Sequence, residues 1–476
     1  MLDWSKLLSA SRRRPSRSSR DEIPLDISAG REEVERDYDR ILFAAPTRRL
    51  ADKTQVFPME ENDSVRTRLT HSHEVSNLAR SIGVQLAFQY GEKVFGSDHE
   101  KLGVKRTVPA LLAAIGLAHD LGNPPFGHQG EASMQQWFLA QAHSISAARH
   151  KGGGEHHDAA PFDPAKYVET DFLNFDGNAQ TLRLLTRLQI LNDDFGLNLT
   201  VSTLSALIKY PVIYGNELCG YKKAGIFRSE ETIVGEIWSG AGLAAGIRHP
   251  LTVVMEACDD IAYSIIDAED TIKKGYASFY DLMDFIGANA QDDVSNEIVD
   301  KAKKKNEEFR KEKLSSRELN DVSMQIFRAI AISKMVEAAT KTFVNNQEVL
   351  MSGHALPGFE LIKESNCRSF CKIVKEFDKR HGFQHRDVLG LELRGHNYIQ
   401  SMMDMLWSSV QEGSASSSPF DRFVYGSVSE NYRRIYEKTD RSDYAKRQLI
   451  CDALSGMTES FLIKKHDQLC SLSKAG

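Results

Sequence analysis

The sequence predicts an all-α protein. Apolar residues recur at a spacing of three to four along most of the chain, which is the period of a helix with one buried face. Strand signals are few and short, and the only β element that the pattern favours is a small hairpin pairing residues 210–214 with 222–227. The sequence has no repeat of fixed period, so we do not expect a solenoid.

The composition narrows the class of protein. Of 476 residues, 41% are hydrophobic and 26% charged, so the chain is neither disordered nor fibrous as a whole. The net charge of −6 gives no overall basic excess that would indicate nucleic-acid binding, although a local basic patch stays open. No run reaches the roughly 18 apolar residues that a membrane span needs, and the N-terminus lacks the apolar core of a signal peptide. Six scattered cysteines without a Cys-x-x-Cys pair are typical of a reducing compartment, so we expect a cytoplasmic protein.

The first element is predicted to be a mobile basic N-terminal arm, residues 1–31. Residues 11–21 are rich in serine and arginine and show no apolar periodicity. A solvated tail without a role and an arm that binds phosphate or nucleic acid both fit this composition.

A helical core is predicted to follow over residues 32–275. Its helix near 110–121 stops at Gly122, where a glycine and two prolines follow one another closely. Glycines and prolines predict an insert loop at 149–165. This loop carries Glu-His-His-Asp at 155–158, for which solvation or adventitious metal binding is the plainer interpretation. Residues 276–476 are predicted to form a C-terminal helical region.

Three groups of residues indicate chemistry: His71, the segment from His119 to Glu131, and a set of residues on a later helix. His71 shares a helix face with apolar residues and so points inward, as a hydrogen-bonded core histidine would. The adjacent pair His119-Asp120 ends an apolar helix abruptly. A buried carboxylate there is costly unless a cation compensates it, and a divalent metal would do so. His128 and Glu131 follow at a spacing of three, which lets a carboxylate sit beside a protonated imidazole.

A third group lies along one predicted helix. Asp259, Tyr263 and Asp267 are spaced at i, i+4 and i+8 and therefore share a face. A carboxylate, an aromatic ring and a second carboxylate suit a metal ligand, a sugar-stacking ring and a hydroxyl acceptor. A plain polar helix face is the alternative for this ladder.

The order His … His-Asp … Asp resembles the HD-domain phosphohydrolases, and the flanking motifs resemble the bacterial dGTP triphosphohydrolases within that superfamily. The resemblance is strong over residues 35–275 and weak beyond them. The motifs that carry it are RRLADKTQVFP (48–58), RTRLTHSHEV (66–75), HDLGNPPFGHQGE (119–131), FDGNAQ (175–180), KYP (209–211), KKAGIFRSE (222–230), RHPLTVVMEACDDIAY (248–263) and, weakly, LELRGHNYI (391–399).

The resemblance implies an enzyme that cleaves a deoxynucleoside triphosphate to deoxynucleoside and tripolyphosphate, with water attacking the α-phosphate. It implies one divalent ion per site, for which Mg, Mn, Fe, Co, Ni and Zn are equally open. By position, the resemblance assigns metal ligands at His71, His119, Asp120 and Asp259, catalytic residues at His128 and Glu131, phosphate contacts at Arg68, Lys209, Lys222 and Lys223, sugar contacts at Gln55, Tyr263 and Asp267, and a site-proximal Asn178.

The resemblance also implies an HD-type helical core and a homo-oligomer, with a hexamer suspected, in which the C-terminal region helps to assemble subunits and complete the site. Single-stranded DNA is a further partner that it leaves open, and no residue identifies the base that is read. Two other functions stay in view. One is an HD phosphohydrolase of another nucleotide phosphoester, and the other is a nucleotide- or DNA-binding regulator with incidental hydrolysis.

Overall fold

The computed structural model describes residues 1–14, 30–59, 65–152, 162–189 and 194–474. Nearly all regular secondary structure in these residues is helical, which confirms the predicted all-α class. Three isolated β-bridges are the only extended pairings among the described residues. No helix in this part of the chain is long and apolar enough to cross a membrane.

The helices are joined by connections of varied length, the longer ones including residues 208–227 and 351–367. In chain order they are Trp4–Leu7 (α1), Glu33–Leu42 (α2), Ala45–Arg49 (α3), Arg68–Gln89 (α4), Gly91–Phe95 (α5), Val104–Ala118 (α6), Gly127–Gly152 (α7), Thr170–Leu173 (α8), Gly177–Arg183 (α9), Val201–Leu207 (α10), Glu231–Ala241 (α11), Thr252–Lys273 (α12), Phe279–Asn289 (α13), Asp293–Arg310 (α14), Ser316–Asn345 (α15), Gln347–Leu350 (α16), Arg368–Phe377 (α17), Arg386–Glu412 (α18), Pro419–Ser427 (α19), Glu430–Glu437 (α20), Asp443–Ser455 (α21) and Glu459–Lys474 (α22). Two π-helical turns, Leu184–Leu188 (η4) and Asp378–Phe383 (η6), interrupt the pattern.

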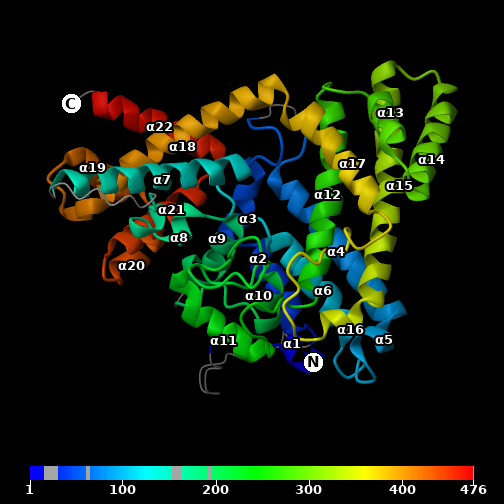
Figure 1. Ribbon diagram of the computed structural model, residues 1–476, viewed down its shortest axis with the longest axis horizontal. Helices are drawn as coiled ribbons and strands as arrows, with labels where there is room; N and C mark the ends of the chain where they lie inside the picture. The colour runs from blue at the N-terminus through cyan, green and yellow to red at the C-terminus, as the bar shows by residue number, and fades with distance from the viewer. Residues whose placement is uncertain (15–29, 60–64, 153–161, 190–193, 475–476) are drawn as a thin grey trace.

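Three long helices, α4, α6 and α12, form the centre of the molecule (Figure 1). The apolar stripe of α4 that the sequence predicts, with Val75, Ala79 and Ile82, is fully buried. Helix α6 approaches α4 so closely that a Cβ at Gly116 would lie 2.8 Å from the Cα of Ser76. This tight packing fixes the ends of the helices from which the site residues project.

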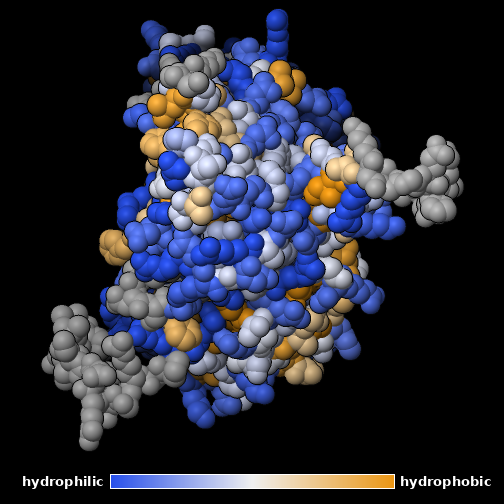
Figure 2. Space-filling view, turned by 90° about the vertical axis from the view of Figure 1, so that its left-hand side faces the viewer, coloured by the Kyte–Doolittle hydropathy of each residue, from blue (hydrophilic) through white to orange (hydrophobic). Residues whose placement is uncertain are grey.

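The C-terminal region wraps around this centre. Helices α13, α14 and α15 stand together beside α12 at the upper right of Figure 1, and α17 and η6 pack directly on α12. The long helix α18 packs along α7, α21 and α22 on the opposite side. The face on that side is mostly hydrophilic, with apolar side chains in small separate groups (Figure 2).

The predicted hairpin at 210–227 is wrong in its detail. The two segments touch through a single parallel bridge between Ile213 and Ile226, with Tyr214 N donating to the carbonyl of Ile226 at 2.9 Å. A hairpin strand would alternate between a buried and an exposed face. Here Val212, Ile213 and Tyr214 are all buried in succession, so the segment has no exposed face.

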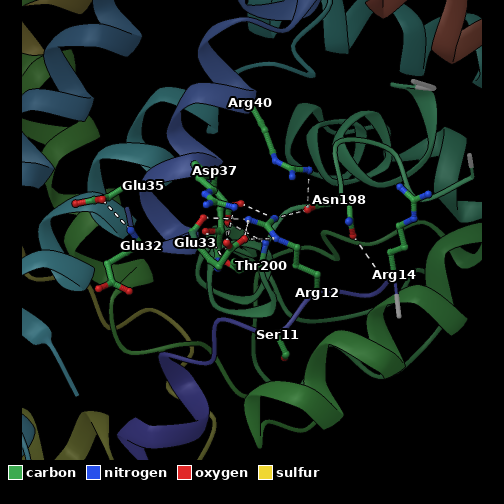
Figure 3. A network of polar contacts seen from close by, with 12 residues as sticks. Ser11, Arg12, Arg14, Glu32, Glu33, Glu35, Asp37, Arg40, Asn198 and Thr200 are labelled. Carbon is green, nitrogen blue, oxygen red and sulfur yellow. Dashed lines mark hydrogen bonds and ion pairs between the residues drawn. The ribbon is translucent and has the colours of Figure 1, made fainter. Parts of the chain in front are cut away.

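The predicted mobile arm is also wrong for its described part, residues 1–14. Trp4 and Leu7 are 6% and 0% exposed, and the Trp4 indole donates to the carbonyl of Val94 at 2.9 Å. Arg12 donates to Asp37 at 2.7 Å and contacts Glu33 of the same helix (Figure 3). Apolar side chains and buried ion pairs therefore anchor this segment, whereas residues 15–29 lie outside the described residues.

The predicted insert loop at 149–165 is shorter than expected at its start. Helix α7 continues to Gly152, and a 3-10 turn covers Pro164–Lys166. The Glu-His-His-Asp sequence at 155–158 lies outside the described residues.

Candidate active site

Three helices deliver the predicted metal ligands to one point. Thr67 caps the start of α4, where its side chain and that of Thr70 form a capping box, and this start places His71 on the inner face. Helix α6 ends at Ala118, directly before His119. The turn that follows needs Gly122, because a Cβ there would lie 2.2 Å from the backbone nitrogen of Thr181. Asp259 projects from the first half of α12.

The ligand atoms of His71, His119 and Asp259 lie within 4.8 Å of one another. His71 Nε2 is 3.2 Å from Asp259 Oδ1, and His119 Nε2 is 3.6 Å from the same oxygen. Both imidazoles are buried, at 0% and 7% exposure. Two imidazole nitrogens and a carboxylate around one point are a donor set that divalent transition metals accept.

The hydrogen bonding of His119 fits a metal. Its Nδ1 lies 2.8 Å from the carbonyl of Gly116, so Nδ1 carries the proton and the lone pair falls on Nε2. That Nε2 is buried and has no hydrogen-bond partner in the described structure. Burial opposes a charge on the ring, yet the carboxylates of Asp120 and Asp259 outweigh it and raise the pKa of His119 to about 9. The site therefore draws positive charge to the position that a metal ion would take.

Asp120, the fourth predicted ligand, lies at the edge of this cluster. Its Oδ2 is 3.5 Å from His119 Nε2 but also forms an ion pair with Arg68, while its Oδ1 accepts from Asn123 at 2.8 Å. Burial alone would raise the pKa of Asp120, but His119 and Arg68 lower it to about 2. The carboxylate is therefore ionised and shared between the cluster and Arg68.

His128 and Glu131 form the pair that the sequence predicts. His128 Nδ1 lies 3.1 Å from Glu131 Oε2, and this hydrogen bond raises the pKa of His128 above its usual value. The other Glu131 oxygen accepts from the backbone nitrogen of Gly177 at 2.7 Å, which fixes the carboxylate. The His128 side chain is 83% exposed and lines the site cavity, where it can meet a substrate.

A cavity of about 400 Å³ opens in front of the cluster. Of the predicted phosphate contacts, Arg68, Lys209 and Lys223 line it, whereas Lys222 is exposed and does not. Burial opposes the charge on Lys209, but Glu256 and Asp259 raise its pKa, so the ammonium stays charged. Lys223 forms an ion pair with Asp176.

Of the predicted sugar contacts, some line the cavity and one does not. Gln55 and Tyr263 line the cavity, and the Tyr263 ring stacks on Phe383 with centroids 5.6 Å apart. Asp267 does not line it, because this residue is fully buried one turn further along α12. Asn178 does line the cavity, and its amide donates to Asp176 at 2.7 Å.

Sequence reasoning missed two lining residues from the C-terminal region, Phe383 and Glu392. Glu392 has no hydrogen bond or ion pair among the described residues, and partial burial raises its pKa. The weak match at 391–399 was the one signal in the sequence that could have pointed to it.

Two further residues that the sequence did not indicate, Lys53 and Glu459, join the cavity wall to the C-terminal region. Buried Lys53 donates to the carbonyls of Asn123 at 2.6 Å and Ser455 at 2.7 Å. Glu459 accepts from the backbone nitrogens of Thr54 at 2.7 Å and Phe126 at 3.0 Å. Desolvation lowers the pKa of Lys53 to about 7, with Arg68 adding to the effect.

The sequence is similar to that of known proteins. Residues 68–152 match the HD domain family. A Listeria monocytogenes protein named deoxyguanosinetriphosphate triphosphohydrolase-like protein is 32% identical over 99% of this chain and 100% of its own length. A protein of the same name from Pseudomonas aeruginosa is 29% identical over 97% of this chain and 97% of its own length. Another from Synechocystis is 29% identical over 99% of this chain and 100% of its own length.

Proposed function

The chain belongs to the deoxyguanosinetriphosphate triphosphohydrolase-like proteins, a family of HD-domain phosphohydrolases, and from this premise we propose that it hydrolyses dGTP to deoxyguanosine and tripolyphosphate. The observation that carries the proposal is the cluster of His71, His119 and Asp259 at the wall of a cavity lined by three cationic side chains.

In this proposal His71, His119, Asp259 and Asp120 hold one divalent ion. When bound, the ion supplies Lewis acidity for the α-phosphate and its attacking water. The residues of the chain then provide orientation and charge. Arg68, Lys209 and Lys223 face a triphosphate of about four negative charges, which requires fixed cations to leave water.

His128 is the proposed general acid. Its hydrogen bond to Glu131 favours the imidazolium form, and its exposed ring can reach the departing 5′-oxygen. Glu131 is fixed by the backbone of Gly177, so it orients the ring and keeps it charged until the proton passes to the leaving oxygen.

Glu392 supports guanine as the base. Guanine presents two adjacent N–H donors on one edge, and a carboxylate with both oxygens unpaired accepts such a pair. Adenine and the pyrimidines do not offer two adjacent donors in this way. Phe383 and Tyr263 give the stacked wall against which sugar and base would lie.

Product analysis tests the proposal. Metal-loaded protein is incubated with each of the four dNTPs, and tripolyphosphate is resolved from pyrophosphate and phosphate. We expect tripolyphosphate and deoxyguanosine from dGTP, and no release by His119→Ala. Stepwise phosphate or pyrophosphate release would instead indicate an HD phosphohydrolase of another class. Light scattering of the same sample tests the proposed homo-oligomer.

A further inference from the structure

A carboxylate from the far end of the chain reaches the wall of the candidate active site. Glu459 is the first residue of α22 and is 4% exposed. A carboxylate in the first turn of a helix commonly interacts with the amide groups of that helix. The hydrogen bonds of Glu459 run to the cavity wall. One oxygen accepts from the backbone nitrogens of Thr54 at 2.7 Å and Phe126 at 3.0 Å, and the other accepts from the Thr54 hydroxyl. Thr54 and Phe126 both line the cavity, so one carboxylate joins two segments of its wall.

The backbone of Phe126 has a conformation that needs support. Its φ is +64°, in the left-handed region that residues with a side chain rarely adopt. Such residues persist where the surrounding structure holds them. Glu459 holds the Phe126 N–H, and the Phe126 ring packs on α18, where a Cβ at Gly395 would lie 2.6 Å from the ring. Without its acceptor, this buried N–H would be unpaired and costly, so the turn would change its conformation.

The conformation of Phe126 sets the first turn of α7. Phe126 directly precedes that helix, and its carbonyl accepts from the Gly130 nitrogen at 3.2 Å. His128 is the second residue of the helix, and its Nδ1 lies 3.1 Å from Glu131 Oε2. The Gly177 backbone fixes Glu131 independently. A change of the turn would therefore move the His128 ring relative to its partner.

We propose that Glu459 is a positioning residue, which holds the left-handed turn at Phe126 and so aims the His128 imidazole at the substrate. The inference rests on the proposed function for its kinetic effect. Thr54 has the complementary part, because its nitrogen and hydroxyl keep the Glu459 carboxylate in place. Glu459 is not among the described residues that line the cavity, so it acts through the turn. Misplacing a catalytic group by about 1 Å can lower a rate about 100-fold.

Steady-state kinetics with dGTP give the first readout. Glu459→Ala removes the acceptor, and Glu459→Asp keeps the charge but is one methylene too short to reach both segments. We expect kcat to fall roughly 10- to 100-fold in Glu459→Ala and by less in Glu459→Asp, with bound metal retained in both. Glu459→Gln, whose amide oxygen can still accept from both nitrogens, should keep kcat near that of the wild type. Ser460→Ala is the matched control, since it removes a 2.8 Å hydrogen bond to Asp52 from the next residue of α22 and should also keep kcat.

A double-mutant cycle separates positioning of His128 from a general loss of structure. His128→Ala should already have a low kcat, and adding Glu459→Ala should lower it no further, because the group that is aimed is absent. A general defect would lower kcat by the same factor in both backgrounds. Equal factors, measured on the folded fraction, would overturn the inference, as would an unchanged kcat in Glu459→Ala. If Glu459→Ala does not fold, Glu459→Asp takes its place in the cycle, and the same two outcomes decide.

Hydrogen exchange tests the same contact without activity. Peptides that cover residues 122–131 report the protection of the Phe126 amide. Exchange in these peptides should be faster in Glu459→Ala or Glu459→Asp than in the wild type, and unchanged in Glu459→Gln and Ser460→Ala. Wild-type protection in Glu459→Ala would overturn the inference whatever the enzyme hydrolyses. A wild type that shows the expected exchange but does not hydrolyse dGTP would count against the proposed function alone.

Discussion

Two buried clusters of charged and polar side chains differ in how completely their groups are paired. In the first, Arg183 donates to both oxygens of Asp452 at 2.7 and 2.8 Å and to Glu230 at 2.8 Å. In the second, around His71, His119 and Asp259, the Nε2 of His119 has no hydrogen-bond partner in the described structure. Charges that satisfy one another, as those of Arg183, Asp452 and Glu230 do, hold the fold together, whereas buried metal-type donor atoms without a partner are suited to receive a ligand.

Helix α9 connects the two clusters. Asn178 near its start lines the site cavity, and Arg183 at its end enters the matched cluster. The matched cluster thus anchors a wall of the unmatched one. Substitutions should separate the two roles. Those in the His71–His119–Asp259 cluster should change metal content and catalysis, and those in the Arg183 cluster should change stability.

The largest effect should come from the unmatched cluster. Asp259→Ala removes an anionic ligand between two imidazoles, so we expect loss of bound metal and of detectable hydrolysis. Metal analysis of the purified variant measures the first and product release the second. Asp260→Asn, which alters the neighbouring carboxylate that binds Lys375, should retain its metal. Full metal occupancy in Asp259→Ala would remove this residue from the ligand set.

Loss of the proposed general acid should come next. His128→Ala should keep its metal and lower kcat by about 10²–10⁴-fold, since proton transfer to the leaving oxygen is lost. His73→Ala, on the exposed side of α4, is the matched control. An unchanged kcat with a higher KM would instead assign His128 to binding.

The matched cluster should respond in stability. Arg183→Met removes the cation that pairs with buried Asp452 and leaves Glu230 with Arg187 alone, which costs about 3–5 kcal/mol of unfolding free energy. Arg434→Met breaks an exposed pair with Glu430 and should cost less than about 1 kcal/mol. Denaturant unfolding measures both, and kcat of folded Arg183→Met should stay near that of the wild type. A loss of kcat larger than the loss of folded protein would show that the clusters are not separable.

The smallest effect concerns selection of the sugar. A 2′-hydroxyl against the Tyr263 ring loses water without gaining a partner, which costs about 1–3 kcal/mol, or roughly 5- to 150-fold. Tyr263→Ala should therefore narrow the dGTP-over-GTP ratio of kcat/KM, and Tyr263→Phe should preserve it because the ring remains. If Tyr263→Ala keeps the wild-type ratio, the ring only packs the core.

The predictable part of the molecule is the part whose residues are close in sequence or fixed by helical period. The stripe of α4 and the end of α6 follow from periodicity and from Gly122, so the positions of His71 and His119 could be anticipated. The burial of Trp4 and Leu7 was also visible in their spacing, but the serine- and arginine-rich stretch after them dominated the interpretation. The predicted hairpin was wrong because a short buried apolar run does not distinguish a strand from another kind of buried segment.

The rest of the site depends on contacts between distant segments. Phe383 and Glu392 reach the cavity from a region whose sequence carries no metal or phosphate pattern. Asp267 shares the helix face of Asp259 and Tyr263, yet α12 enters the core within one turn and places it behind the cavity. Helical periodicity predicts which residues share a face, but it does not predict how deeply neighbouring elements bury each of them.

The clamp at Lys53 and Glu459 gives the order in which this protein can mature. Lys53 binds Ser455 across 402 positions, and Thr54 binds Glu459 across 405. At a translation rate of about 5–20 residues per second, these partners leave the ribosome roughly 20–80 s apart. In the later half of that interval, once Asp259 has been made, the nascent chain carries every proposed metal ligand but lacks the contacts that close the wall. The wall of the site therefore closes only when nearly all of the polypeptide has been made.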